Sequence, residues 1–197
     1  MIINNFHVTG SITLHDIYTA MPWSNTIDVV TIRGDTLKSV LEHSVSKYNI
    51  NDPDPGGRFL QVSGLILKYD VRRAPGQRLL SAETSSDHSP IKDDLVYKVA
   101  VPSFLATGGD TFAMIPEQLI EYKNTGFLDN DLIVAYLKKH NPLQLPKAGR
   151  MVVLSDNTNP TTMVIASRGA IAWSPLALTD ALMLWITMYN LIVATLV

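Results

Sequence analysis

The hydrophobic residues of this chain follow two periods, one typical of strands and the other typical of helices. Segments with period-two alternation or runs of β-branched residues are predicted to be strands: residues 27–33, 60–69, 78–80 and 95–101. Segments with a capping pattern or with apolar residues three and four positions apart are predicted to be helices: residues 13–20, 37–48, 116–122 and 129–140. Residues 104–114 are predicted to form a loop.

Polar residues at the ends of these segments set the predicted boundaries. Thr13 and Asp16 form a Thr-x-x-Asp capping pattern at the start of the first helix. Gly34-Asp35 predicts a turn before the second helix, and Asn130 is predicted to cap the last helix. Because strands and helices are mixed without regular βαβ alternation, the pattern predicts an α/β (α+β) fold in which helices pack on a mixed sheet.

The predicted elements end near residue 152, which divides the chain into three parts. Residues 1–152 are expected to form one domain, residues 153–180 a polar linker, and residues 181–197 a hydrophobic tail. A domain usually takes about 100–200 residues, so one domain with a tail fits the chain length.

Composition and charge narrow the possible functions. The net charge is −2 and the isoelectric point is about 6.2, so nucleic acid is not an expected partner. The chain has no cysteine, which excludes disulfides, thiolate nucleophiles and cysteine zinc sites. Its five histidines stand far apart, so we expect no metal site and no cofactor in this chain. The N-terminus lacks the basic and apolar regions of a signal peptide.

Two segments place an aromatic residue shortly after a proline, at the end of a predicted element. Trp23 follows Pro22, and Phe104 follows Pro102 by two positions. Two rings that face each other form a slot for a flat base, and stacking contributes about 1–3 kcal/mol per base. Asp110 follows a glycine pair, and its carboxylate could accept both hydrogen bonds of a ribose diol.

Spacing by itself favours plainer roles for these residues. Trp23 and Phe104 have the spacing of core aromatics, and an aspartate after two glycines is more often part of a turn. His43, within the predicted helix 37–48, is expected on the helix surface or half-buried. The nucleoside slot therefore depends on the rest of the sequence for support.

Seven motifs in register make the chain resemble the C-terminal domain of the 5′-nucleotidase family, nearest to the animal ecto-5′-nucleotidases and the insect apyrases. The resemblance covers roughly residues 8–152, and the motifs together are far more specific than any one of them. They are Pro22-Trp23 with Asp28, Gly34–Leu37 with Glu42–Val45, Arg58–Gly64, Tyr69-Asp70, Pro75-Gly76, Tyr97–Val99 and Phe104–Phe112.

The resemblance implies a role for each candidate residue. Trp23, where the family usually has Phe, and Phe104 would stack on the two faces of a purine base, and Asp110 would bind the ribose hydroxyls. In the family, an N-terminal metallophosphatase domain holds a zinc-type pair of metal ions and hydrolyses the phosphate ester. The family's Asn-Gly-Gly-Gly-Ile-Arg segment, which contacts ribose and phosphate, is not reproduced in residues 2–5.

We therefore expect a substrate-recognition domain that binds a purine nucleoside or nucleotide and is inactive without the metallophosphatase domain. The resemblance also implies a possible homodimer and a parent protein at the cell surface or outside the cell. The alternative is a module that binds nucleosides, or dimerises, without any catalytic role. An upstream reading frame that encodes metal-ligand motifs would favour the enzyme.

The tail suggests attachment to a membrane. Residues 181–197 are almost entirely apolar but fall short of the roughly 20 residues that a spanning helix needs. A small residue, a polar spacer and a terminal apolar run form a GPI-attachment signal, with Ser155 and Ser167 as candidate attachment sites. A short transmembrane helix or a mis-joined exon is the alternative.

Overall fold

The computed structural model describes residues 11–49, 57–141 and 148–155, together with the backbone of residues 191–196. In this part of the chain, strands and helices are mixed as the sequence predicts. In chain order the elements are α1 (Leu14–Ala20), β1 (Ile27–Arg33), α2 (Gly34–Ser44), β2 (Gln61–Ser63), β3 (Leu65–Asp70), β4 (Leu79–Thr84), β5 (Val96–Pro102), α3 (Ser103–Ala106), the 3-10 helix η1 (Gly109–Thr111), α4 (Met114–Glu117), β6 (Glu121–Lys123), α5 (Asp129–Lys139), β7 (Met151–Leu154) and β8 (Leu191–Leu196).

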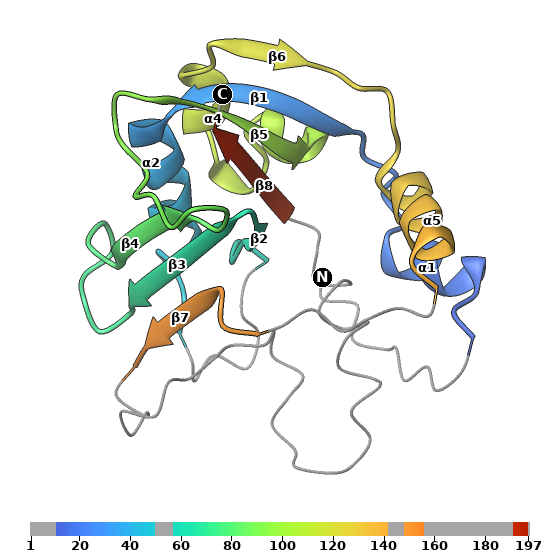
Figure 1. Ribbon diagram of the computed structural model, residues 1–197, viewed down its shortest axis with the longest axis horizontal. Helices are drawn as coiled ribbons and strands as arrows, with labels where there is room; N and C mark the ends of the chain where they lie inside the picture. The colour runs from blue at the N-terminus through green and yellow to red at the C-terminus, as the bar shows by residue number, and fades with distance from the viewer. Residues whose placement is uncertain (1–10, 50–56, 142–147, 156–190, 197) are drawn as a thin grey trace.

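The described strands form two mixed sheets (Figure 1). The larger sheet has the order β2-β8-β5-β1-β6, and the smaller has the order β4-β3-β7. In the larger sheet β1 is antiparallel to both of its neighbours, β5 and β6. In the smaller sheet β3 pairs antiparallel with β4 and parallel with β7. This arrangement confirms the predicted α/β class with a mixed sheet.

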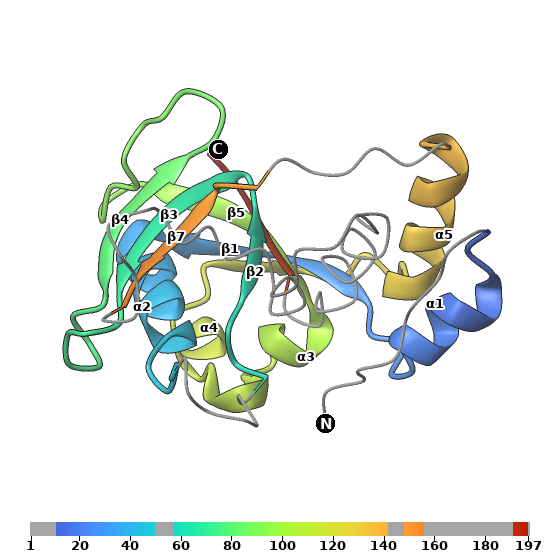
Figure 2. The same ribbon diagram turned by 90° about the horizontal axis from the view of Figure 1, so that it is seen from below.

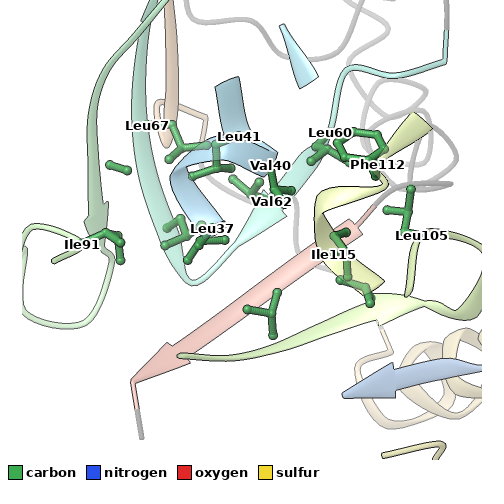
Figure 3. Packing of buried hydrophobic residues seen from close by; sticks show 14 of the residues in the cluster. Leu37, Val40, Leu41, Leu60, Val62, Leu67, Ile91, Leu105, Phe112 and Ile115 are labelled. Carbon is green, nitrogen blue, oxygen red and sulfur yellow. The ribbon is translucent and has the colours of Figure 1, made fainter. Parts of the chain in front are cut away.

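Helix α2 packs between the two sheets, and Figure 2 shows α3 and α4 on the same side of the larger sheet as α2. The apolar face that its helical spacing predicts is buried, with Leu37, Val40 and Leu41 at most 1% exposed. Figure 3 shows these side chains close to Val62 and Leu67 of the strands. Burying one such side chain stabilises the fold by about 1.5–3 kcal/mol, so α2 joins the sheets into one core.

Gly34-Asp35 does not form the predicted turn, because α2 begins directly at Gly34. The amide of Gly34 donates to the carbonyl of Leu95 over 2.9 Å. A Cβ added at Gly34 would lie 1.9 Å from the carbonyl oxygen of Lys92 and 3.0 Å from the ring of Tyr97. Glycine is therefore required here by the close approach of another backbone segment.

The single strand predicted over residues 60–69 is wrong, because this segment forms two strands that belong to different sheets. Gly64 separates β2 from β3 with a φ of 77°, in the left-handed region that glycine adopts readily. The predicted inward face is nevertheless confirmed, since Leu65, Leu67 and Tyr69 are all buried. The predictions for β1, β4 and β5 agree with the structure in type, although Leu95, predicted on the inner face, precedes β5 and is exposed.

The segment after β5 differs most from the prediction. The expected loop over residues 104–114 contains most of α3 and all of η1, and the helix expected over residues 116–122 is wrong. Helix α4 ends at Glu117, and residues 121–123 form β6 on the outer edge of β1. Pairing with a distant strand thus overrides a helical spacing that extends over only seven residues.

Helices α1 and α5 lie side by side at one end of the molecule (Figures 1 and 2). The predicted capping box of α1 is confirmed: Thr13 Oγ1 accepts from the amide of Asp16 over 3.3 Å, and Asp16 Oδ2 accepts from the amide of Thr13 over 2.7 Å.

The cap predicted for α5 is wrong, because the N-cap residue is Leu128 and Asn130 lies within the helix. The amide side chain of Asn130 donates to Ser24 Oγ over 3.3 Å, so a tertiary contact takes the place of a capping contact. Leu132 and Tyr136, predicted to point inward, are 39% and 38% exposed.

The end of the chain contributes to both sheets. Strand β7 pairs with β3 as far as Leu154, and Ser155 directly after it is buried. Residues 191–196 of the hydrophobic tail form β8, parallel to β2 and antiparallel to β5. Ser167 and the rest of residues 156–190 lie outside the described residues. Among the helices that the structure describes, none has the length and apolar character that a membrane crossing requires.

We predict that Gly34→Ala destabilises the protein by at least about 2 kcal/mol, because the new Cβ forces the backbone at Lys92 to move. The free energy of unfolding can be measured by urea denaturation followed by circular dichroism. Gly57→Ala is the matched control, because a Cβ there meets nothing within 4 Å. Its expected change is within about 0.5 kcal/mol, and an equal effect of the two substitutions would contradict the prediction.

Candidate functional site

The pairing of β1 with β5 brings the two candidate segments to one end of the larger sheet. The register places Ile27, the first residue of β1, opposite Pro102, the last residue of β5. The segment before β1 carries Trp23, and the helix after β5 carries Phe104. A hydrogen bond of 2.8 Å from the Ser103 amide to the Thr26 carbonyl joins the two segments. Residues about 80 positions apart in sequence therefore belong to neighbouring segments.

The segment that carries Trp23 is anchored by hydrogen bonds to two helices. On the α3 side, Ser103 Oγ donates to Asn25 Oδ1 over 3.3 Å. On the α5 side, the amide of Asp129 donates to the Asn25 carbonyl over 2.8 Å, and Asn130 holds Ser24. Trp23 itself is 47% exposed, so it is not the core aromatic that spacing by itself favours. A fixed backbone thus presents a large aromatic side chain at the surface.

Phe104 and the residues before Asp110 are in close steric contact. Phe104 lies in α3, half-buried against the hydrophobic core. A Cβ added at Gly109 would lie 2.5 Å from Cζ of the Phe104 ring and 2.6 Å from each of its two Cε atoms. The ring therefore lies directly on the Gly109 backbone, and the next residue is Asp110. The structure thus brings the Phe104 ring against the backbone of the residue before Asp110, where a side chain would require the ring to move.

The backbone around Asp110 adopts a conformation that is rare for residues with a side chain. Gly108, Asp110 and Thr111 have φ values of 90°, 51° and 65°. Positive φ values in residues other than glycine cost energy and concentrate at functional sites. Among the described residues other than glycine, those with positive φ are Ser24, His88, Asp110 and Thr111, so three of the four lie in the two candidate segments.

His43 also belongs to this region, a contact that the sequence did not reveal. It is half-buried on α2, as expected, and its Nε2 lies 3.1 Å from Thr111 Oγ1. Its ring contacts Phe112 edge-on, with centroids 4.8 Å apart and planes at 78°. The partner is 68 positions away in sequence, so helical spacing, which finds neighbours on one face, could not identify it.

The environment of His43 favours its neutral form. Burial lowers the pKa of the imidazole below its ordinary value, and the nearby positive charges of Arg58 and Lys47 lower the pKa further. A hydrogen bond with the backbone of Asp110 acts in the opposite direction but is weaker than the effect of burial.

On the β6 side of β1, the buried carboxylate of Asp28 accepts hydrogen bonds from residues in and after β6. Asp28 is fully buried and accepts hydrogen bonds from the hydroxyl of Tyr122 over 2.5 Å and from the amide of Thr125 over 3.3 Å. The bond to Asp28 is the main cause of a raised pKa of the Tyr122 phenol. This network ties the segment between β6 and α5 to the start of β1, and so supports the anchor beneath Trp23.

The described residues do not provide a metal site. No group of three or more His, Cys, Asp or Glu side chains that could hold a metal ion occurs in residues 11–49, 57–141 and 148–155. The residues present therefore do not fit the metal pair that the resemblance implies for the family. What the candidate site offers is an exposed indole, a half-buried phenyl ring and a carboxylate. Their roles in binding a base and a ribose stay predictions.

Comparison with known proteins gives consistent matches to one family. The family model described as "5'-nucleotidase, C-terminal domain" matches residues 2–117. The chain is 36% identical over 148 residues to a 5′-nucleotidase of Bos taurus, covering 72% of this chain and 25% of that protein. It is 34% identical over 151 residues to an apyrase of Tabanus yao, covering 74% of this chain and 27% of that protein.

A solved structure gives the same result for the fold. The 5′-nucleotidase precursor from Thermus thermophilus superposes with a TM-score of 0.68 at 33% identity, over 74% of this chain and 28% of that one. The chain spans about a quarter of the length of the relatives it matches. The resemblance inferred from the seven motifs is confirmed: this chain belongs to the 5′-nucleotidase family, of which it carries the C-terminal domain.

Proposed function

We propose that this chain is the nucleoside-recognition part of a 5′-nucleotidase-type phosphohydrolase, and that it binds a purine nucleoside or nucleotide without hydrolysing it by itself. One observation carries the proposal: the β1–β5 register sets the start of β1, next to the segment of Trp23, opposite the end of β5, next to the helix of Phe104. The Phe104 ring in turn contacts the backbone of Gly109, the residue before Asp110. These are the residues that match the family's base-stacking and ribose-binding positions.

The two aromatic residues suit the binding of a flat base because their backbones are already held in place. Hydrogen bonds to α3 and α5 anchor the segment of Trp23, and the Phe104 ring packs directly on the backbone of Gly109. A site that is ordered before binding loses less conformational entropy when the ligand arrives. Exposed aromatic surface on a fixed backbone therefore favours stacking over a structural role for Trp23.

Asp110 suits the recognition of a ribose diol. Its carboxylate can accept two hydrogen bonds, and the turn that carries it begins at the glycine under Phe104. A base stacked on the phenyl ring would thus bring its attached sugar toward the carboxylate. Hydrogen bonds to a charged group contribute about 1.5–3 kcal/mol each, so Asp110 would distinguish ribose from a sugar without the diol.

Hydrolysis is assigned to the metallophosphatase domain that the resemblance implies, and the site in this chain would orient the substrate toward it. The tail residues 181–197 remain candidates for a GPI signal, with attachment at Ser155 or Ser167. A location at the cell surface and pairing into a homodimer belong to the same proposal. None of these three features is needed for nucleoside binding by the described residues.

We predict that adenosine quenches the fluorescence of Trp23. The measurement uses a chain with Trp173→Phe and Trp185→Phe, so that Trp23 is its one remaining tryptophan.

Trp23→Ala, measured by calorimetry in the natural background, should weaken adenosine binding about tenfold or more, because it removes one stacking surface. Asp110→Asn should weaken adenosine binding while leaving 2′,3′-dideoxyadenosine unaffected. Unchanged fluorescence at millimolar adenosine would count against the proposed function.

We predict that Gly109→Ala weakens adenosine binding about tenfold, because the new methyl group displaces the Phe104 ring. Isothermal titration calorimetry gives the affinity, and circular dichroism checks that the fold is kept. Gly57→Ala, at an open position, is the control and should bind like the natural chain. Equal affinities of the two variants would show that the position of Phe104 does not matter for binding.

We predict that the purified 197-residue chain releases no phosphate from AMP above the blank, even with added zinc. The reason is that the proposed site holds a base and a sugar but provides no metal-activated water. Phosphate release is measured colorimetrically, with an unrelated metallophosphatase in the same buffer as the positive control. Measurable turnover that co-purifies with the chain would contradict the prediction.

A further inference from the structure

We propose that His43 is a positioning residue for Asp110, which it holds by binding the strained turn that carries the carboxylate. This inference rests on the proposed function, because it assigns Asp110 to a ribose. It adds to that function a residue from a different element, helix α2, whose side chain supports the turn from outside it.

The geometry of the turn shows why it needs support. Asp110 and Thr111 both have positive φ, which few residues with a side chain adopt, and two such residues in succession are costly. Within the turn, the amide of Phe112 donates to the carbonyl of Gly109 over 3.1 Å. One hydrogen bond within the turn is a small return for this cost, so contacts from outside the turn contribute to keeping this conformation.

The hydrogen-bond pattern identifies His43 as the donor in that contact. The hydroxyl of Thr111 has one proton, which it donates to the carbonyl of Asp110 over 2.6 Å. In this arrangement the oxygen of Thr111 accepts from Nε2 of His43, which lies 3.1 Å away. The imidazole consequently carries its proton on Nε2, and the edge-on contact with Phe112 fixes the ring plane.

This arrangement leaves the carboxylate of Asp110 available to a ligand. The contact that His43 makes is with the hydroxyl of Thr111, and it does not use the side chain of Asp110. Burial together with the charges of Arg58 and Lys47 keeps the pKa of His43 low, so that its ring is neutral at pH 7. A neutral donor does not form an ion pair with the carboxylate, which can therefore bind two ribose hydroxyls.

The first test measures the preference of the chain for adenosine over 2′,3′-dideoxyadenosine by calorimetry at about pH 7.5, where the imidazole is neutral. We expect a preference of about tenfold or more in the natural chain, because the diol binds a charged group. His43→Leu should reduce the preference to less than about threefold while leaving the affinity for dideoxyadenosine unchanged. His43→Gln, whose amide nitrogen can replace Nε2 as a donor, should restore most of the preference.

Two further variants complete the set. Thr111→Val keeps the shape of the side chain but removes the hydroxyl, both as acceptor from His43 and as donor to the Asp110 carbonyl, so it should reproduce the loss with His43 intact. It gives a second readout of the contact if His43→Leu does not fold. His15→Leu changes an exposed histidine on α1 and is the matched control, with an unchanged preference expected.

The second test needs no ligand. Amide hydrogen exchange of Phe112, followed by NMR, reports on the turn, because its N–H bonds to Gly109. His43→Leu and Thr111→Val should speed this exchange about tenfold or more, whereas His43→Gln and His15→Leu should not. The amide of Val99 in the core of the larger sheet should keep its rate in all variants, which shows that the fold is intact.

The outcomes separate this inference from the proposed function. If the natural chain binds neither nucleoside, the proposed function is overturned, and faster exchange of Phe112 in His43→Leu still supports the contact between His43 and the turn. An unchanged exchange rate in that variant overturns the inference in every case. When the natural chain does prefer adenosine, a change in only one of the two measurements also overturns it, because positioning requires both to change together.

Discussion

The antiparallel pairing of β1 with β5 is the constraint on which the candidate site depends. Its register is fixed by the core, because Val30 and Ile32 of β1 and Tyr97 and Val99 of β5 are all buried. A slip of one residue would turn these side chains to the opposite face of the sheet. The same register sets the start of β1 beside the end of β5. Hydrophobic burial within the sheet thus determines which two loops meet at its end.

Hydrogen bonds, rather than apolar packing, then refine the position of each loop. The Trp23 segment is held by Ser103, Asp129 and Asn130, and the Asp110 turn by His43. Such contacts fix the backbone while leaving the indole of Trp23 exposed. This division explains how an exposed tryptophan and a strained turn can persist on a small domain, since the conformational cost is offset by contacts with rigid elements.

The sequence predicted those features that depend on local chemistry. The capping box of α1, the β-branched strand β1 and the apolar face of α2 each have a local cause, and each is present. Errors arose where a distant segment decides the outcome. The close approach of Lys92 requires a glycine at position 34, where α2 begins, and pairing with β1 makes residues 121–123 a strand. The candidate site shows the same limit. The family motifs indicated Trp23, Phe104 and Asp110 as candidates, but they could not show that Gly109 lies against the Phe104 ring or that His43 reaches Thr111. Close approach and backbone strain are properties of coordinates and leave no periodic signal in a sequence.

The position of β8 links the tail to the integrity of the larger sheet. Residues 191–196 lie between β2 and β5 and pair with both, so their backbone satisfies hydrogen-bonding groups on two neighbouring strands. A GPI signal is removed when the anchor is attached. The same residues therefore cannot be both a strand of the folded sheet and a discarded signal. In an anchored form, another strand would have to fill the place of β8, because two unpaired edges inside a sheet favour association with other chains. The proposed GPI signal and strand β8 of the folded sheet thus share the same six residues.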